Sequence, residues 1–176
     1  MSSCRKRIWI TIVLLLLLIS CATSYKEIFL NRTYRENLSL EDQELKSLQF
    51  FISTSVYVQH DSPTGKKTIL LPEETPGVVT SVGPDWLKVS FRKGGIDVPF
   101  IVNKRAQYDL YYVATEVPGK TGFHMLKDLP EKIFYYQGTP YRVISGEKAH
   151  LMVDSKGLQK LLKKRVPTQG RRVKTN

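Results

Sequence analysis

The chain has 176 residues, of which 41% are hydrophobic and 24% charged, and its 27 Lys and Arg against 16 Asp and Glu give a formal net charge of +11. This composition excludes a fully disordered or collagen-like chain and a multi-pass membrane protein, and the two cysteines are too few for a small disulfide-rich domain. An excess of basic residues is typical of nucleic-acid-binding proteins, so the position of these charges along the chain decides how they are interpreted.

The first segment has the pattern of a secretory signal. Arg5, Lys6 and Arg7 precede an apolar run, Ile8–Ile19, that contains five consecutive leucines. The run is shorter than the roughly 20 apolar residues that a membrane-spanning helix needs. A basic start followed by a short apolar run predicts a signal peptide over residues 1–20.

The end of this segment, Leu18-Ile19-Ser20-Cys21, resembles the lipobox of bacterial lipoproteins. The resemblance implies cleavage before Cys21, diacylglycerol on its sulfur and an acyl chain such as palmitate on its amine, and we expect no other cofactor. An ordinary signal peptide with an incidental cysteine, or an uncleaved anchor, is the alternative. No Asp follows Cys21, which by the same resemblance implies the outer membrane of a two-membrane host; a one-membrane host stays open. Cys4 leaves with the signal, so we expect no disulfide.

Residues 21–38 are polar and lack periodicity, which predicts a lipidated, flexible tether. The 17 residues after Cys21 would reach at most about 60 Å when extended. Ser39-Leu-Glu-Asp42 resembles a capping box, and Leu45, Leu48 and Ile52 follow at helical spacing. A short helix over about residues 40–49 is therefore expected.

Beyond this helix the pattern is that of short strands. Leu87, Val89 and Phe91 alternate with polar residues, as in a half-buried strand. The expected strands are 50–60, 66–71, 77–82, 86–91, 96–102, 108–117, 132–137, 141–145 and 149–154. Glycine and proline turns between them predict an antiparallel, mainly β domain over residues 39–155, either a small barrel or a sandwich. The stretch Thr75–Phe91 resembles an SH3-like barrel.

Aromatic residues are concentrated in the late strands. Tyr111 and Tyr112 must take opposite faces of a strand, as must Tyr135 and Tyr136. An exposed row of aromatic side chains would suit contact with a sugar or a protein, whereas ordinary packing in the core is the alternative.

The excess of bases over acids lies at the two ends of the chain. Residues 1–21 hold three bases and no acid, residues 22–155 hold 16 of each sign, and residues 156–176 hold eight bases and no acid. In this last segment Leu158, Leu161 and Leu162 share one face of a predicted helix, and a tail follows. The candidate residues for binding an anionic surface are Lys160, Lys163, Lys164, Arg165, Arg171, Arg172 and Lys174.

These bases favour anionic lipid headgroups, an acidic envelope polymer or a protein as the partner. A solvated tail without a partner is the alternative. Nucleic acid is not expected as a partner, because the neutral β region carries no basic stripe and the predicted compartment is the envelope.

No catalytic or metal-binding residue is predicted, and we expect a protein that is not an enzyme. His60, His124 and His150 are far apart in the sequence, and no HExxH, GxSxG, Walker or GxGxxG motif is present. His60 and Asp61 fall at a strand end, where a solvated turn pair is favoured over a catalytic dyad.

The mature pattern also resembles a set of uncharacterised bacterial envelope lipoproteins. The resemblance is carried by Gln49–Ser53, Thr75–Val78, Ala149–Val153 and Gly170–Val173. The resemblance supports the fold and implies no activity. From the anchor, the charge placement and the missing catalytic motifs, we expect a membrane-anchored, non-enzymatic binding or structural component of the bacterial cell envelope. The alternatives are an accessory subunit of a secretion or assembly complex and an envelope hydrolase.

Cys21→Ser tests the anchor. Without the thiol no diacylglycerol can be attached, so the variant should leave the membrane fraction or accumulate with its signal uncleaved. Fractionation with immunoblotting measures this, and unchanged processing and membrane retention would reject the lipid anchor.

Overall fold

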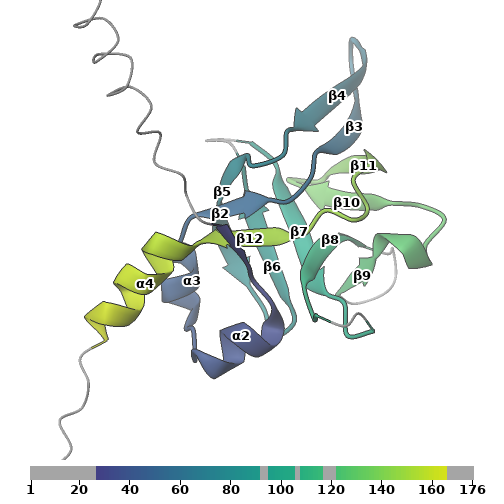
Figure 1. Ribbon diagram of the computed structural model, residues 1–176. Helices are drawn as coiled ribbons and strands as arrows, with labels where there is room; N and C mark the ends of the chain where they lie inside the picture. The colour runs from purple at the N-terminus through teal and green to yellow at the C-terminus, as the bar shows by residue number, and fades with distance from the viewer. Residues whose placement is uncertain (1–26, 92–94, 106–107, 117–121, 166–176) are drawn as a thin grey trace, which may run out of the picture.

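The computed structural model describes residues 27–91, 95–105, 108–116 and 122–165, which form a mainly β structure (Figure 1). The predicted signal peptide, Cys21 and the tail from residue 166 onward lie outside the described residues. The prediction of an antiparallel, mainly β domain is confirmed.

The described strands form two sheets in which every paired neighbour is antiparallel. The larger sheet has the order β1 (Glu27–Phe29), β12 (Leu151–Asp154), β2 (Phe50–Ile52), β5 (Pro76–Val82), β6 (Trp86–Ser90), β7 (Asp97–Val102), β8 (Tyr111–Glu116) and β9 (Phe123–Met125). The smaller sheet has the order β10 (Ile133–Tyr136), β11 (Thr139–Ser145), β3 (Val56–Ser62) and β4 (Gly65–Leu71). Both orders are open, so the described strands do not close a barrel and are consistent with a sandwich.

One hydrophobic core joins the two sheets. Phe50 and Phe100 of the larger sheet and Val58 and Phe134 of the smaller sheet are all fully buried in it. Strand alternation supplies these residues, as in β6, where Leu87 and its second neighbour are buried and the residues between them are half-buried.

The described helices are short. They are α2 (Arg32–Asn37), α3 (Asp42–Ser47), the 3₁₀ helix η1 (Leu126–Asp128) and α4 (Ser155–Lys164). The helix expected over residues 40–49 is present as α3, but its capping box lies between Glu41 and Glu44, not at Ser39–Asp42. The basic helix α4 is also present, and the side chain of Asp154 caps it by accepting from the backbone N–H groups of Lys156 and Gly157.

The prediction of a flexible tether is wrong for residues 27–38. β1 pairs with β12, Leu30 is fully buried, and Asn31 caps α2 by accepting from the Tyr34 N–H at 2.6 Å. A three-residue strand and a six-residue helix are too short to show a period in the sequence, and contacts with the rest of the domain stabilise them.

Two further differences concern the strands. The segment expected as one strand over residues 50–60 divides at Ser53 into β2 and β3, which belong to different sheets. The chain thereby passes from one layer to the other. β9 was not expected, because its three residues follow a glycine-containing segment and show no alternation.

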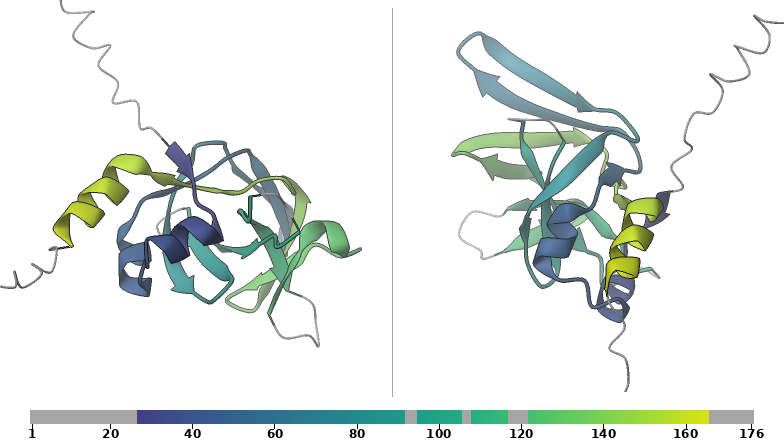
Figure 2. Two further views of the ribbon diagram at one scale, coloured as in Figure 1. Left: turned by 60° about the horizontal axis from the view of Figure 1, so that its bottom comes forward. Right: turned by 90° about the vertical axis from the view of Figure 1, so that its left-hand side faces the viewer.

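The two ends of the domain carry different elements. α4 lies at one end, whereas the β3–β4 and β10–β11 hairpins lie at the other (Figure 1 and the right view of Figure 2). The described chain begins at β1, beside the start of α4.

Leu30→Ala tests whether the first described segment belongs to the fold. Removing a fully buried leucine side chain should lower the free energy of unfolding by about 2–5 kcal/mol. Denaturant unfolding measures this. The neighbouring Phe29 is 60% exposed, so Phe29→Ala should cost less than half as much. Equal, small effects of both variants would show that this segment is not packed on the domain.

Candidate functional site

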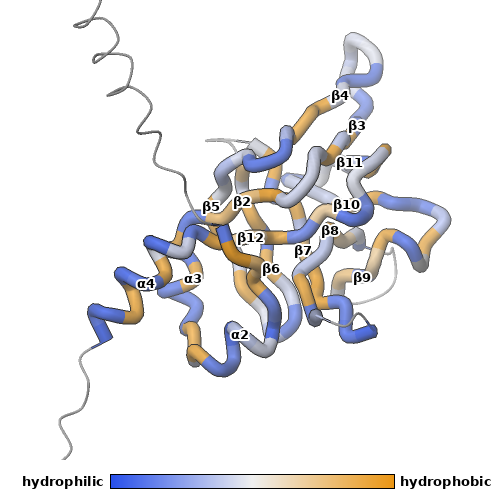
Figure 3. The backbone as a smooth tube through the Cα atoms, viewed as in Figure 1, coloured by the Kyte–Doolittle hydropathy of each residue, from blue (hydrophilic) through white to orange (hydrophobic). Residues whose placement is uncertain are grey.

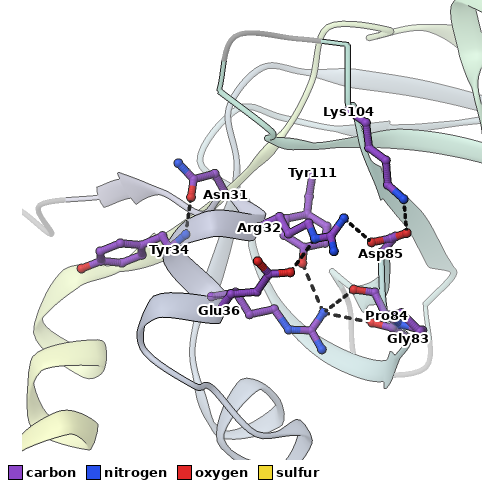
Figure 4. Close-up of polar contacts among 10 residues, drawn as sticks. Asn31, Arg32, Tyr34, Glu36, Gly83, Pro84, Asp85, Lys104 and Tyr111 are labelled. Carbon is purple, nitrogen blue, oxygen red and sulfur yellow. Dashed lines mark hydrogen bonds and ion pairs between the residues drawn. The ribbon is translucent and has the colours of Figure 1, made fainter.

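A network of charged side chains attaches α2 to the turn between β5 and β6 (Figure 4). Arg35 Nη1 donates to the Gly83 carbonyl oxygen at 2.9 Å and to the Tyr111 hydroxyl at 3.2 Å. Tyr111 is fully buried, and burial raises the pKa of its phenol. The phenol therefore stays neutral near pH 7 and serves as a fixed hydrogen-bonding partner.

The second half of this network is centred on Asp85. Arg32 lies 2.6 Å from Glu36 and 3.2 Å from Asp85, and Lys104 lies 2.6 Å from the other Asp85 oxygen. The carboxylates and cations of this network pair with one another. The network therefore holds the N-terminal segment in place on the larger sheet.

His150 forms a Ser–His pair that sequence spacing could not indicate, because its partner lies 97 residues away. The Ser53 Oγ atom is 3.0 Å from His150 Nδ1 and also accepts from the His150 backbone N–H at 3.0 Å. Among the described atoms His150 Nε2 has no hydrogen-bond partner, so no carboxylate orients the ring as in a catalytic triad. The pair ties the end of β2 to the start of β12.

The other two histidines lie elsewhere. His60 packs against the Tyr141 ring at 4.8 Å, and His124 lies opposite Thr115 in the β8–β9 pair. Within the described ranges no group of three or more His, Cys, Asp or Glu side chains is arranged to hold a metal ion.

The solvent-facing side of the smaller sheet is the strongest candidate for a binding site. Strand alternation turns Val58 and Phe134 toward the core and their neighbours outward. Four large hydrophobic side chains on this side are 39–52% exposed: Tyr57, Leu70, Tyr135 and Ile144. We call this surface, together with Gln59, Lys66, Ile133, Pro140 and Arg142, the outer face.

A hollow of about 280 Å³ lies on the outer face. Its walls include the aliphatic side chains of Ile133 and Ile144 and the charged side chains of Lys66 and Arg142. Neither cation forms an ion pair with a described residue. A hollow that combines aliphatic walls with two cations and the Asp61 carboxylate can accept an apolar group that carries a nearby carboxylate.

His60 and Asp61 also line this hollow, but they do not form a dyad. His60 Nδ1 lies 3.1 Å from the backbone oxygen of Asp61, and adjacent strand residues direct their side chains to opposite faces. Both residues lie within β3, opposite Lys67 and Lys66 of β4, so the interpretation of a turn pair is wrong.

The late tyrosines divide between core and surface as the alternation predicts. Tyr111 is buried and Tyr112 half-buried, whereas Tyr135 is exposed and Tyr136 is half-buried against the core. Both interpretations of the aromatic residues therefore hold for part of the set.

The basic residues predicted to bind an anionic surface fall into an exposed group, one internal contact and a group outside the described residues. Lys160, Lys163 and Lys164 are exposed on α4. Arg165 instead turns toward α3, where its Nε donates to Glu44 at 2.8 Å and its Nη2 donates to the Ser39 carbonyl oxygen at 2.9 Å. Arg165 is therefore an internal contact in this structure. Cys21, Arg171, Arg172 and Lys174 lie outside the described residues.

Comparison with protein-family models, with curated proteins and with solved structures finds no match for this chain. In the described part of the chain no helix has the length and apolar character required to cross a membrane.

Glu44→Gln tests the Arg165 contact. The hydrogen bond from Arg165 holds the pKa of Glu44 below its ordinary value of 4.5. Glu44 therefore stabilises the fold above that pH, and the stabilisation is lost as the pH falls through the lower, folded-state pKa. Glu44→Gln should lower the unfolding temperature at pH 7, and the difference from wild type should shrink toward pH 3. The control is Glu131→Gln, an exposed carboxylate before β10. A pH-independent difference for Glu44→Gln would contradict the pairing.

Proposed function

We propose that this protein is a lipid-anchored, non-enzymatic binding component of the bacterial cell envelope that docks a partner protein on its outer face. The lipobox-like Leu18–Cys21 supports the anchor. The outer face supports the docking, and it is the observation on which the proposal depends.

The outer face concentrates apolar surface that the fold leaves exposed. Of the seven large hydrophobic side chains exposed among the described residues, four lie there. Tyr57 and Leu70 are direct partners in the β3–β4 register, so their side chains form a continuous apolar patch. Contiguous apolar surface around a hollow is typical of a site that another molecule covers.

The chemistry of the patch favours a protein over a glycan. Interface centres are enriched in tyrosine and arginine together with aliphatic side chains and are poor in acids. The outer face has a similar composition: Ile133, Ile144 and Arg142 line the hollow, and the exposed Tyr57 and Tyr135 lie on the same side of the sheet. A glycan would require many hydrogen-bonding groups, of which Gln59 is the main uncharged one lining the hollow.

The unpaired cations specify the partner further. Lys66 and Arg142 form no ion pair with a described residue, and Asp61 is the one carboxylate among the residues that line the hollow. The two cations outnumber this carboxylate, so the partner should place acidic side chains around an apolar anchor. This chemistry favours an accessory subunit of an envelope complex over a free-standing structural protein.

Site-specific photo-crosslinking tests the proposal. A photoreactive phenylalanine analogue at Tyr135 or Ile144 in the full chain, expressed in the native bacterium, should give one discrete crosslinked protein band. Val78, 48% exposed on the larger sheet, is the matched control position and should not give that band. Arg142→Glu should remove the band, because it replaces the cation by a charge that repels the partner's acids.

The same experiment can contradict the proposal. Identical bands from Val78, a band that survives Arg142→Glu, or a crosslink to a polysaccharide would each reject a protein docked on the outer face.

A further inference from the structure

The anchored end of the chain enters the domain at the base of α4. Glu27, the first described residue, pairs with Asp154 in the β1–β12 ladder. Asp154 is also the residue that caps the N-terminus of α4. A lipid on Cys21 would therefore hold the start of α4 near the bilayer.

The length of chain between Cys21 and Glu27 limits how far the domain can move from the lipid. Six residue steps of about 3.3–3.6 Å reach at most about 20 Å. The unfolded tether that the sequence suggests would have allowed about 60 Å. α4 itself is only about 15 Å long, so a tilt of the domain is enough to bring its whole length to the headgroup region.

The solvent side of α4 is cationic. Lys160, Lys163 and Lys164 are exposed, and the last two lie three and four residues after Lys160, so they share a face with it. Leu158, fully buried, marks the opposite face, and hydrophobic and hydrophilic positions alternate along the helix (Figure 3). None of the three lysines forms an ion pair with a described residue. We call these three residues the lysine face.

Carboxylates near the chain entry restrict which part of α4 can contact an anionic surface. Glu27 lies opposite Asp154 at the start of α4. Burial and the charges of Glu74, Glu73 and Asp154 raise the pKa of Glu27, because other acidic groups lie near it. The lysine face lies in the C-terminal half of α4, where Glu44 is already neutralised by Arg165.

We infer that the lysine face binds the anionic lipid headgroups of the bilayer that carries the Cys21 lipid. This inference rests on the proposed anchor. Each lysine close to an anionic membrane contributes about 1 kcal/mol, an attraction that fades within a Debye length of about 8 Å at physiological salt. Because the outer face lies at the other end of the domain, this contact directs the outer face away from the bilayer (Figure 2).

Vesicle binding of the unlipidated mature chain tests the lysine face independently of the lipid. Every described contact lies within residues 27–165, so the chain of residues 21–176 with Cys21→Ser retains them all. It should sediment with vesicles of phosphatidylcholine containing about one third phosphatidylglycerol, but not with pure phosphatidylcholine, and added salt should release it.

Two variants of equal charge separate the lysine face from net charge. Lys160→Gln, Lys163→Gln and Lys164→Gln together should weaken binding about tenfold or more. Lys66→Gln, Lys67→Gln and Arg142→Gln together remove the same charge at the opposite end and should leave binding unchanged. Both keep the basic residues beyond 165, so any binding through that segment is common to the two. Thermal unfolding checks that both variants fold.

Equal binding by the two variants, or equal binding to pure phosphatidylcholine, would overturn the inference. Such a result combined with membrane release of Cys21→Ser in cells would leave the lipid anchor standing and reject the lysine face alone. Membrane retention of Cys21→Ser would reject the anchor itself.

Discussion

The attachment of residues 27–38 to the domain is the constraint on which the rest of the structure depends. Leu30 is buried in the core, β1 completes the edge beside β12, and Arg35 donates to the Gly83 carbonyl and the Tyr111 hydroxyl. These contacts replace a long tether by a short connection to Cys21. They also fix the point of chain entry beside α4. With the proposed lipid on Cys21, that end of the domain would lie near the bilayer and the outer face would lie at the other end.

The charges of the chain have three different roles. The predicted signal carries three of the +11, and the body between residues 22 and 155 is formally neutral. Within the body, pairs such as Lys104 with Asp85 connect loops, while Arg165 reaches back to Glu44. The cations that remain unpaired among the described residues include the lysine face at one end and Lys66 and Arg142 at the other. The net charge of +11 alone would suggest a nucleic-acid-binding protein. The basic residues are instead divided among the predicted signal, internal contacts and two separate surfaces.

Strand alternation was enough to predict the mainly β fold, because residues such as Leu87 and Val89 show a period of two that burial requires. The N-terminal contribution to the fold was not predictable, since β1 and α2 are too short to show a period and depend on partners more than 70 residues away, such as Tyr111. Alternation also predicted that Tyr135 and Tyr136 face opposite sides, but not which side is covered. The hollow on the outer face combines the β3–β4 and β10–β11 hairpins, and no sequence spacing links one hairpin to the other.

Amide hydrogen exchange of the chain from residue 21 tests the attachment of the N-terminal segment most directly. The Leu30 N–H donates to the Leu151 carbonyl at 3.4 Å and the Arg32 N–H donates to the Asp109 carbonyl at 3.1 Å. We predict that both amides are protected to the same degree as those of β12, because they open only when the edge of the larger sheet opens. Exchange of Leu30 and Arg32 at the rate of an unstructured peptide would show that the segment is a free tether, and the arrangement of the domain at the membrane would no longer follow.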